Sequence, residues 1–223
     1  MQQNLFITGT DTAVGKTHVT AALLTELRRR GISAAAFKPI ACGTGGRHDA
    51  EIYVAIMNHE QPLDVINPIY LRHPLAPSVA AKLERKSIDL RKIIRTYQQL
   101  SANYSVVLVE GAGGLLVPIR DDYFVADLAK SLKLPLVIVA RLGLGTINHT
   151  LLTVHQANAH GLKIAGLVLN DTVGGRQGLA EKTNIRAVPK LCKVPLLGVM
   201  PHSKKALPTS AKKICDQLFS EPL

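Results

Sequence analysis

The chain alternates short apolar runs with amphipathic stretches along most of its length. Short apolar runs predict buried strands, whereas apolar residues that recur every three or four positions predict helices. The runs predict strands over residues 4–8, 33–38, 105–109, 135–140, 164–170 and 196–199. The periodic stretches predict helices over residues 17–30, 49–57, 88–100, 125–132 and 146–160, and a last helix that ends at residue 218. Residues 61–78 hold four prolines and predict an irregular excursion over the strand ends.

This alternation predicts a mostly parallel sheet with right-handed crossovers and helices on both faces. Hydrophobic residues make up 47% of the 223 positions, but aromatic residues only 4%, and Trp is absent. Aliphatic side chains must therefore fill the core, as is typical of a parallel sheet covered by helices. Because no linker or internal repeat interrupts the pattern, we expect one domain over residues 1–223.

The formal net charge of +11 raises the question of an anionic partner. Arginines occupy positions 28–30, at the end of a predicted helix, where cations complement the helix dipole. No basic segment is interleaved with aromatic residues, so we expect no nucleic-acid partner. The three cysteines lack the close spacing of a zinc site and suit a reducing cytoplasm. The most apolar stretch, residues 134–140, is too short to span a bilayer, so we expect a cytoplasmic protein without membrane contact.

A glycine-rich segment, residues 9–17, lies between the first predicted strand and the first predicted helix. This context is the one that a phosphate-binding loop requires, because backbone N–H groups at a helix start point at the anion. Lys16 is expected to reach the β- and γ-phosphates of ATP, and the Thr17 hydroxyl to ligate Mg²⁺. Five residues separate Gly9 from Gly15, where the common pattern has four, so the loop is a variant. The pattern predicts a P-loop NTPase-like α/β fold and phosphoryl transfer from MgATP.

Two charged residues stand at the ends of predicted strands. Glu110 ends an apolar strand, and the carboxyl ends of strands form the ligand crevice in open α/β sheets. A carboxylate there is expected to hold Mg²⁺ beside the phosphate loop. Lys38 ends the second strand and precedes Pro39. The doubly wound topology brings Lys38 close to the phosphate loop, which makes it a candidate catalytic cation.

Several segments together resemble the dethiobiotin synthetase family in identity, order and spacing. They are residues 9–17 (GTDTAVGKT), 38–43 (KPIACG), 109–114 (VEGAGG), 145–149 (GTINH) and 170–171 (ND). The resemblance runs from about residue 4 to about residue 203, which is nearly the whole chain. It implies that CO₂ is joined to 7,8-diaminononanoate with MgATP, giving dethiobiotin, ADP and phosphate. The implied intermediates are a carbamate and a carbamic–phosphoric mixed anhydride, and the family is homodimeric.

The resemblance also implies roles for individual residues. It makes Lys38 and Lys16 catalytic and gives the metal to Thr17, Asp49 and Glu110. The implied nucleotide-binding residues are Asp11, Thr12, Ala13, Val14, Gly15, Lys16, Thr17, Asp49, Glu110, Gly111, Ala112, Gly113, Asn170, Asp171, Pro201, His202 and Ser203. The implied substrate-binding residues are Thr10, Lys38, Cys42, Gly145, Thr146 and Asn148.

Two positions depart from the family pattern. Cys42 stands where the family usually has Ser, and a thiol is a weaker hydrogen-bond donor than a hydroxyl. Lys204 and Lys205 precede Leu207, a position where an acidic residue would contact the ribose.

Two other classes share the phosphate loop. A partitioning-type switch ATPase carries a lysine early in the loop, and residues 10–12 contain none. An amidating synthetase of the cobyrinic-acid type adds a glutaminase domain, for which this chain has no room. Dependence of ATP hydrolysis on the diamine or on DNA distinguishes the enzyme from the switch.

Overall fold

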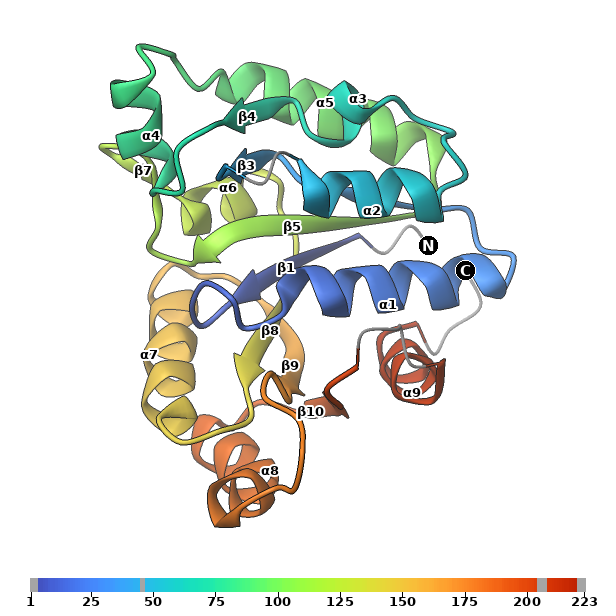
Figure 1. The fold of residues 1–223 in the computed structure, drawn as a ribbon, viewed down its shortest axis with the longest axis vertical. Helices are drawn as coiled ribbons and strands as arrows, with labels where there is room; N and C mark the ends of the chain where they lie inside the picture. The colour runs from blue at the N-terminus through green and yellow to red at the C-terminus, as the bar shows by residue number, and fades with distance from the viewer. Residues whose placement is uncertain (1–3, 45–46, 204–207, 220–223) are drawn as a thin grey trace.

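The computed structural model describes residues 4–44, 47–203 and 208–219. A six-stranded parallel sheet with the strand order β10-β9-β8-β1-β5-β2 forms its centre (Figure 1). These strands are β1 (Leu5–Gly9), β2 (Ala34–Phe37), β5 (Val106–Gly114), β8 (Leu136–Arg141), β9 (Ile164–Asn170) and β10 (Leu196–Met200). All four residues of β2 and all five of β1 are buried, so both sheet faces are covered, as the composition predicts.

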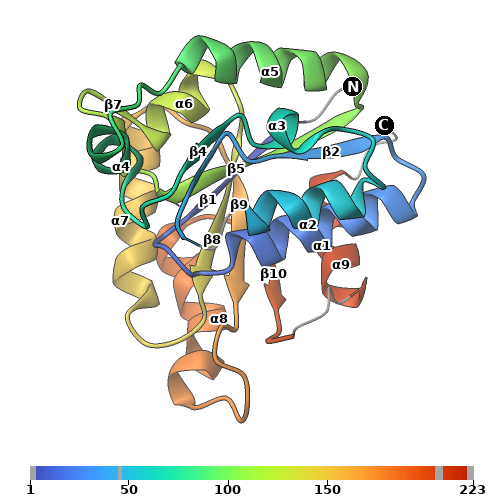
Figure 2. The ribbon, with the colours of Figure 1, turned by 45° about the horizontal axis from the view of Figure 1, so that its top comes forward.

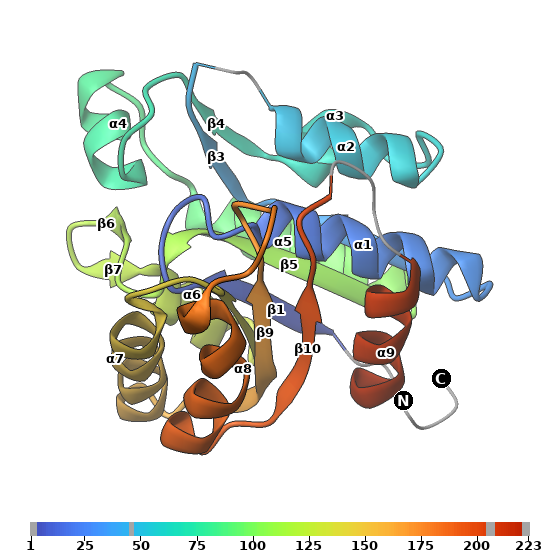
Figure 3. The ribbon, with the colours of Figure 1, turned by 60° about the horizontal axis from the view of Figure 1, so that its bottom comes forward.

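Helices cover the sheet on both faces (Figures 2 and 3). Two pack together on one face, α1 (Lys16–Arg29) and α9 (Pro208–Leu218). The other face carries α5 (Leu90–Asn103), α6 (Val125–Ser131), α7 (Thr146–Ala159) and α8 (Leu179–Cys192). Right-handed crossovers require this division, because the chain moves toward β2 after β1 and back toward β10 after β2.

Shorter elements lie outside the central sheet. A small two-stranded sheet joins β3 (Ile40–Cys42) to β4 (Ile69–Leu71), and a second one joins β6 (Pro118–Arg120) to β7 (Tyr123–Phe124). The helices α2 (His48–Ile56), α3 (Leu63–Ile66) and α4 (Pro77–Leu83) complete this part of the chain. Asn67, which ends α3, ties this part of the chain to the end of β2, because its side chain donates to the Lys38 carbonyl oxygen at 2.7 Å.

The register of the sheet places the carboxyl ends of its strands side by side. Ile7 pairs with Glu110, and Phe37 pairs with Val109. Lys38, the next residue after Phe37, therefore comes level with Glu110 at the same edge. On the other side of β1, Asn170 is flanked by Arg141 of β8 and Met200 of β10.

Most predicted elements are present, but the prediction omits the strand β3, the β6–β7 pair and the helix α8. The helix α8 contains Pro189, and only Asn184, Val188 and Cys192 are buried in it. Residues 61–78 are not wholly irregular: they contain α3, β4 and the start of α4. Pro77 begins α4 at a position where proline is tolerated, since that N–H group needs no helical partner.

Candidate functional site

The phosphate loop connects β1 to α1, as the sequence predicts. Gly15 lies at the helix start with φ of +93°, a value that favours glycine. A Cβ atom at Gly15 would also come within 2.0 Å of Nδ2 of Asn170. That Nδ2 atom donates to the carbonyl oxygen of Val14 at 2.9 Å, so Asn170 supports the loop from below.

Lys16 is the first residue of α1, and its side chain folds back over the loop. Its Nζ donates to the carbonyl oxygen of Asp11 at 3.0 Å, and the residue is only 6% exposed. Burial lowers the pKa of Lys16 to about 8, although the nearby Glu110 carboxylate opposes the shift. A bound phosphate would supply the counter-charge that this buried ammonium needs.

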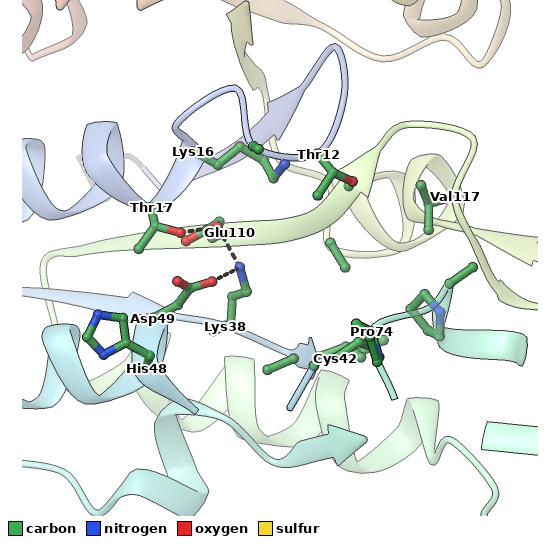
Figure 4. Close-up of a pocket in the computed structure, with 18 of the residues that line it drawn as sticks. Thr12, Lys16, Thr17, Lys38, Cys42, His48, Asp49, Pro74, Glu110 and Val117 are labelled. Carbon is green, nitrogen blue, oxygen red and sulfur yellow. Dashed lines mark hydrogen bonds and ion pairs between the residues drawn. The ribbon is translucent and has the colours of Figure 1, made fainter. Parts of the chain in front are cut away.

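Four side chains from different elements meet beside the loop (Figure 4). Nζ of Lys38 lies 2.5 Å from Oε1 of Glu110 and 2.8 Å from Oδ2 of Asp49. The Thr17 hydroxyl donates to the same Oε1 atom of Glu110 at 2.9 Å. One connected cluster thus forms from Lys38 and Glu110 at two strand ends, Asp49 from α2 and Thr17 from α1.

Opposite charges favour the ionised forms of Lys38 and Asp49 despite their burial. Burial lowers the pKa of Lys38, but the carboxylates of Glu110 and Asp49 outweigh it and raise that pKa overall. Burial likewise raises the pKa of Asp49, but the Lys38 ammonium outweighs it and lowers that pKa overall. Glu110 is 1% exposed. A carboxylate so deeply buried is tolerated when it is paired and hydrogen-bonded.

A cleft of about 830 Å³ opens over this cluster. Eleven of the predicted site residues line it: Thr12, Ala13, Gly15, Lys16, Thr17, Lys38, Cys42, Asp49, Glu110, Ala112 and Gly113. The predicted excursion contributes residues 74–77 to the opposite wall. Volume and lining suit a polyphosphate and a second small molecule side by side.

Other predicted residues lie in the phosphate loop or next to it. The Asp11 carboxylate accepts from the backbone N–H group of Thr12 at 2.7 Å and pairs with Arg141 at 2.8 Å. Val14 is buried, and a Cβ atom at Gly111 would lie 2.9 Å from the Phe6 ring. Among the described residues, the buried Thr10 hydroxyl has no hydrogen-bond partner.

The predicted adenine-side residues follow β9 and β10. Oδ1 of Asn170 is buried and has no hydrogen-bond partner among the described residues. The Asp171 carboxylate accepts from the backbone N–H groups of Val173 and Gly174 and so closes its own turn. His202 packs against Gly174, which brings the 171–174 turn next to the segment of Pro201, His202 and Ser203. Lys204, Lys205 and Leu207 lie outside the described residues.

Three of the predicted substrate-binding residues, Gly145, Thr146 and Asn148, lie at the start of α7, outside the lining of the cleft. Gly145 caps the helix with φ of +89°, and Asn148 is exposed. Thr146 is fully buried, and its hydroxyl faces that of Thr150 at 3.4 Å. The whole of Thr146 is therefore covered in this arrangement, and its backbone N–H group bonds to the Gly143 carbonyl oxygen.

Sequence reasoning missed two residues of the site. Tyr53 is completely buried on α2 and donates its hydroxyl to Oε2 of Glu110. Its position four residues after Asp49 is a detectable signal, because residues so spaced lie on one helix face. Arg141 at the end of β8 pairs with Asp11, and no motif marks it.

A strand, a glycine-rich loop that closes on Gly-Lys-Thr, a helix and a parallel sheet define a P-loop nucleoside-triphosphate-binding protein. The ATP-dependent dethiobiotin synthetase of Bacillus licheniformis is 41% identical over 211 residues, which cover 93% of this chain and 89% of that protein. The chain belongs to the family of ATP-dependent dethiobiotin synthetases.

Further relatives and a family model agree with this assignment. The ATP-dependent dethiobiotin synthetase of Methanocaldococcus jannaschii is 38% identical over 200 residues, covering 88% of this chain and 92% of that protein. A family model described as an AAA domain matches residues 3–209.

Solved structures resemble the fold. The MinD septum site-determining protein of Pyrococcus horikoshii, complexed with Mg-ADP, superposes with a TM-score of 0.66 over 98% of this chain and 96% of that chain. A ParA family ATPase from Chlorobium tepidum superposes with a TM-score of 0.58 over 99% and 90%. Sequence identities of 16% and 11% limit both similarities to the fold.

None of the helices in the described ranges is long and apolar enough to cross a membrane.

Proposed function

We propose that this chain closes the ureido ring of dethiobiotin from 7,8-diaminononanoate, CO₂ and ATP, a ligase step of biotin biosynthesis. One amine of the substrate adds to CO₂ and loses a proton, which gives a carbamate. A carbamate oxygen attacks the γ-phosphorus of ATP, forming the mixed anhydride and releasing ADP. The second amine attacks the carbamate carbon, the ring closes, and phosphate leaves.

The charges of the cleft suit the phosphoryl-transfer step. The carbamate and the triphosphate are both anions and repel each other. Lys16 and Lys38 both line the cleft and are both 6% exposed, so their charges are little screened by water. We assign Lys16 to the β- and γ-phosphates and Lys38 to the carbamate and the charge that develops in its transfer.

The oxygen atoms around Lys38 fit a magnesium ion. Asp49 and Glu110 already hold one cation, the Lys38 ammonium, between their carboxylate oxygens, and the Thr17 hydroxyl lies 2.9 Å from the same Glu110 oxygen. Among the described residues, no three His, Cys, Asp or Glu side chains form a complete metal site. That absence agrees with Mg²⁺ sites in which waters and substrate phosphates complete the ligand shell. When bound with ATP, Mg²⁺ neutralises charge on the transferred phosphoryl group.

The nucleotide base is assigned to the ends of β9 and β10. The unpartnered Oδ1 of Asn170 is a buried acceptor, and an adenine amino group is a matching donor. The turn at residues 171–174 directly follows Asn170 and packs against His202. An acceptor at this position also favours a base with an exocyclic amino group over one with a carbonyl oxygen.

We further propose that one domain over residues 1–223 carries the activity and that it works as a cytoplasmic homodimer, without nucleic acid or membrane contact. Strands from both halves of the chain form the same sheet, which supports a single domain. The exposed Asn148 and the cap Gly145 lie outside the cleft lining, which supports a contribution to a neighbouring subunit's site.

The observation that carries the proposal is the contact of Lys38 with Glu110 and Asp49 beside the phosphate loop. The test is a coupled assay of ADP release with ATP, bicarbonate and 7,8-diaminononanoate, each omitted in turn. We expect ADP release only in the complete mixture and dethiobiotin as its product. ADP release without diamine that rises on addition of DNA would contradict the proposal and favour a switch ATPase.

A further inference from the structure

Glu110 uses its two carboxylate oxygens for different partners. Oε1 faces the cleft side of the cluster, where it accepts from Lys38 at 2.5 Å and from Thr17 at 2.9 Å. Oε2 accepts from the hydroxyl of Tyr53. The carboxylate is therefore held in one orientation, with one oxygen committed to the protein interior.

The fold places Tyr53 in contact with Glu110. It lies one helical turn after Asp49 on α2, so the same helix delivers both residues to the cluster. The whole residue is inaccessible to solvent, so its hydroxyl has no access to water. The phenol O–H is the donor in this contact, because an ionised carboxylate only accepts hydrogen bonds.

We propose that Tyr53 is a positioning residue that keeps Oε1 of Glu110 turned toward Mg²⁺ by binding Oε2. The inference rests on the metal role of Glu110 in the proposed function. Without the phenol donor, Oε2 would be a buried acceptor with no partner. The carboxylate would then be free to turn both oxygens toward the Lys38 ammonium, to which Oε1 is already bound. A cation already paired with both oxygens leaves fewer lone pairs for a metal, so Mg²⁺ binding weakens.

The effect is separable from nucleotide binding. Tyr53 does not line the cleft and lies behind Glu110 from the side of the phosphate loop. ATP affinity at saturating Mg²⁺ should therefore change little when the phenol hydroxyl is removed. Loss of a group that orients a metal ligand typically lowers metal affinity by about 10- to 100-fold.

The experiment measures the Mg²⁺ concentration that half-saturates binding of a fluorescent ATP analogue to the full chain, without turnover. Tyr53→Phe should raise this concentration about tenfold or more. The matched control is Tyr97→Phe on α5, which removes another largely buried phenol hydroxyl, one that accepts from Asn4 at 2.9 Å far from the cleft. The control should leave Mg²⁺ half-saturation unchanged within about twofold.

Two further variants separate this inference from the proposed function. Glu110→Gln should itself raise the half-saturating Mg²⁺ concentration, and Tyr53→Phe should add nothing in the Glu110→Gln background. A raised value for Glu110→Gln with a normal value for Tyr53→Phe overturns the inference and leaves the proposed function intact. A normal value for Glu110→Gln overturns both the metal role of Glu110 and the inference.

A second measurement avoids substitutions at Tyr53, in case that variant does not fold. It is a crystal structure of the wild-type protein with Mg²⁺ and ADP. We expect the Tyr53 hydroxyl within hydrogen-bond distance of Oε2 of Glu110, with Oε1 directed at the metal or at a water bound to it. A carboxylate turned so that both oxygens face the metal, with Tyr53 bound elsewhere, overturns the inference.

Discussion

Lys38 and Glu110 form an ion pair of 2.5 Å in which both side chains are almost completely removed from water. The pair joins the ends of two neighbouring strands, since Phe37 and Val109 are in register. The Lys38 ammonium lies close to the phosphate loop and is held only by side chains. It can therefore release one carboxylate partner and bind an anionic substrate in its place. The same pairing makes either charge costly to remove alone.

We expect Lys38→Met to reduce turnover about 100- to 1,000-fold, because a charge aimed at the transferred group is lost. The KM for ATP should stay within about threefold, since the interaction is made mainly in the transition state. The variant also leaves the buried Glu110 carboxylate without its cationic partner and should lower the free energy of unfolding by about 3–5 kcal/mol. The double variant Lys38→Met/Glu110→Gln serves as a control: it should recover stability in urea but not turnover. Equal losses of turnover and ATP affinity would instead place Lys38 on the nucleotide.

The phosphate loop provides a second prediction. Lys16→Ala should lower turnover about 100-fold or more at saturating MgATP, because a buried charge on the β- and γ-phosphates is lost. Thr17→Val keeps the shape of the side chain and removes the hydroxyl that lies 2.9 Å from Glu110. It should raise the Mg²⁺ requirement at least about tenfold. Steady-state assays with varied Mg²⁺ measure both effects, and wild-type turnover in Lys16→Ala would show that the loop is wrongly assigned.

Acid stability depends on a carboxylate far from the cleft. Hydrogen bonds from Arg29, followed by Arg30, outweigh the burial of Glu26 and hold its pKa at about 2. A folded-state pKa below the unfolded value of 4.5 stabilises the fold above that value, and this stabilisation is lost as the pH falls from 4.5 to about 2. Arg30 also pairs with Asp216 at 2.8 Å, so Glu26 orients a contact between α1 and α9.

Glu26→Gln should therefore destabilise the protein at neutral pH and much less at about pH 3. Urea unfolding at the two pH values measures the difference. Glu51→Gln on α2, an exposed position, is the matched control and should leave the pH dependence unchanged. A destabilisation by Glu26→Gln that is equal at both pH values would show that lost packing, and not the charge, is responsible.

Cys42 lies on the cleft wall, at a position where the family resemblance implies a serine. Burial, and then the negative charge of Glu84, raise the pKa of this thiol to about 11, so it stays protonated and a weak donor. Cys42→Ser should leave turnover intact and leave the KM for the diamine equal or lower. Cys42→Ala, which has no donor, should not lower that KM. Steady-state kinetics with varied diamine test this, and a severe loss of activity in Cys42→Ser would reveal an unrecognised role of the thiol.

The sheet and the phosphate loop could be predicted from sequence because local patterns encode them. Buried strands such as residues 106–109 are uninterrupted apolar runs, and the loop carries its own motif. The presence of Lys38 and Glu110 in the site could also be predicted, since parallel strands end at a common edge. Their direct contact could not be predicted, because it depends on the register between β2 and β5.

The parts that sequence reasoning missed depend on tertiary contacts. The helix α8 contains Pro189 and buries only three residues, one of them Asn184, whose side chain donates to the Leu142 carbonyl oxygen at 2.9 Å. In the sequence Tyr53 is indistinguishable from an aromatic core residue, and only the structure shows that its hydroxyl donates to Glu110. Arg141 and Asp11 are 130 positions apart, and no local pattern pairs them.

The start of α7 supports a last prediction, about assembly. The diamine substrate carries a carboxylate at the far end of an apolar chain, and a helix start is a favourable anion site. Asn148 is exposed there, outside the cleft of its own chain, so a neighbouring subunit's substrate is the target that we expect. Asn148→Ala should raise the KM for the diamine about tenfold and leave the KM for ATP unchanged. Asn158→Ala, an exposed asparagine near the other end of the same helix, is the control and should change neither constant.

A mixing experiment tests directly whether two subunits share a site. Asn148→Ala and Lys38→Met homodimers are mixed in equal amounts, allowed to exchange subunits and assayed at low diamine. If the sites are composite, half of the dimers are mixed and each holds one complete site, so about a quarter of wild-type activity should return. Activity equal to the average of the two variants would mean that each subunit builds its site alone. A fully active monomer in sedimentation experiments would also contradict the homodimer, because no partner would be present to supply Asn148.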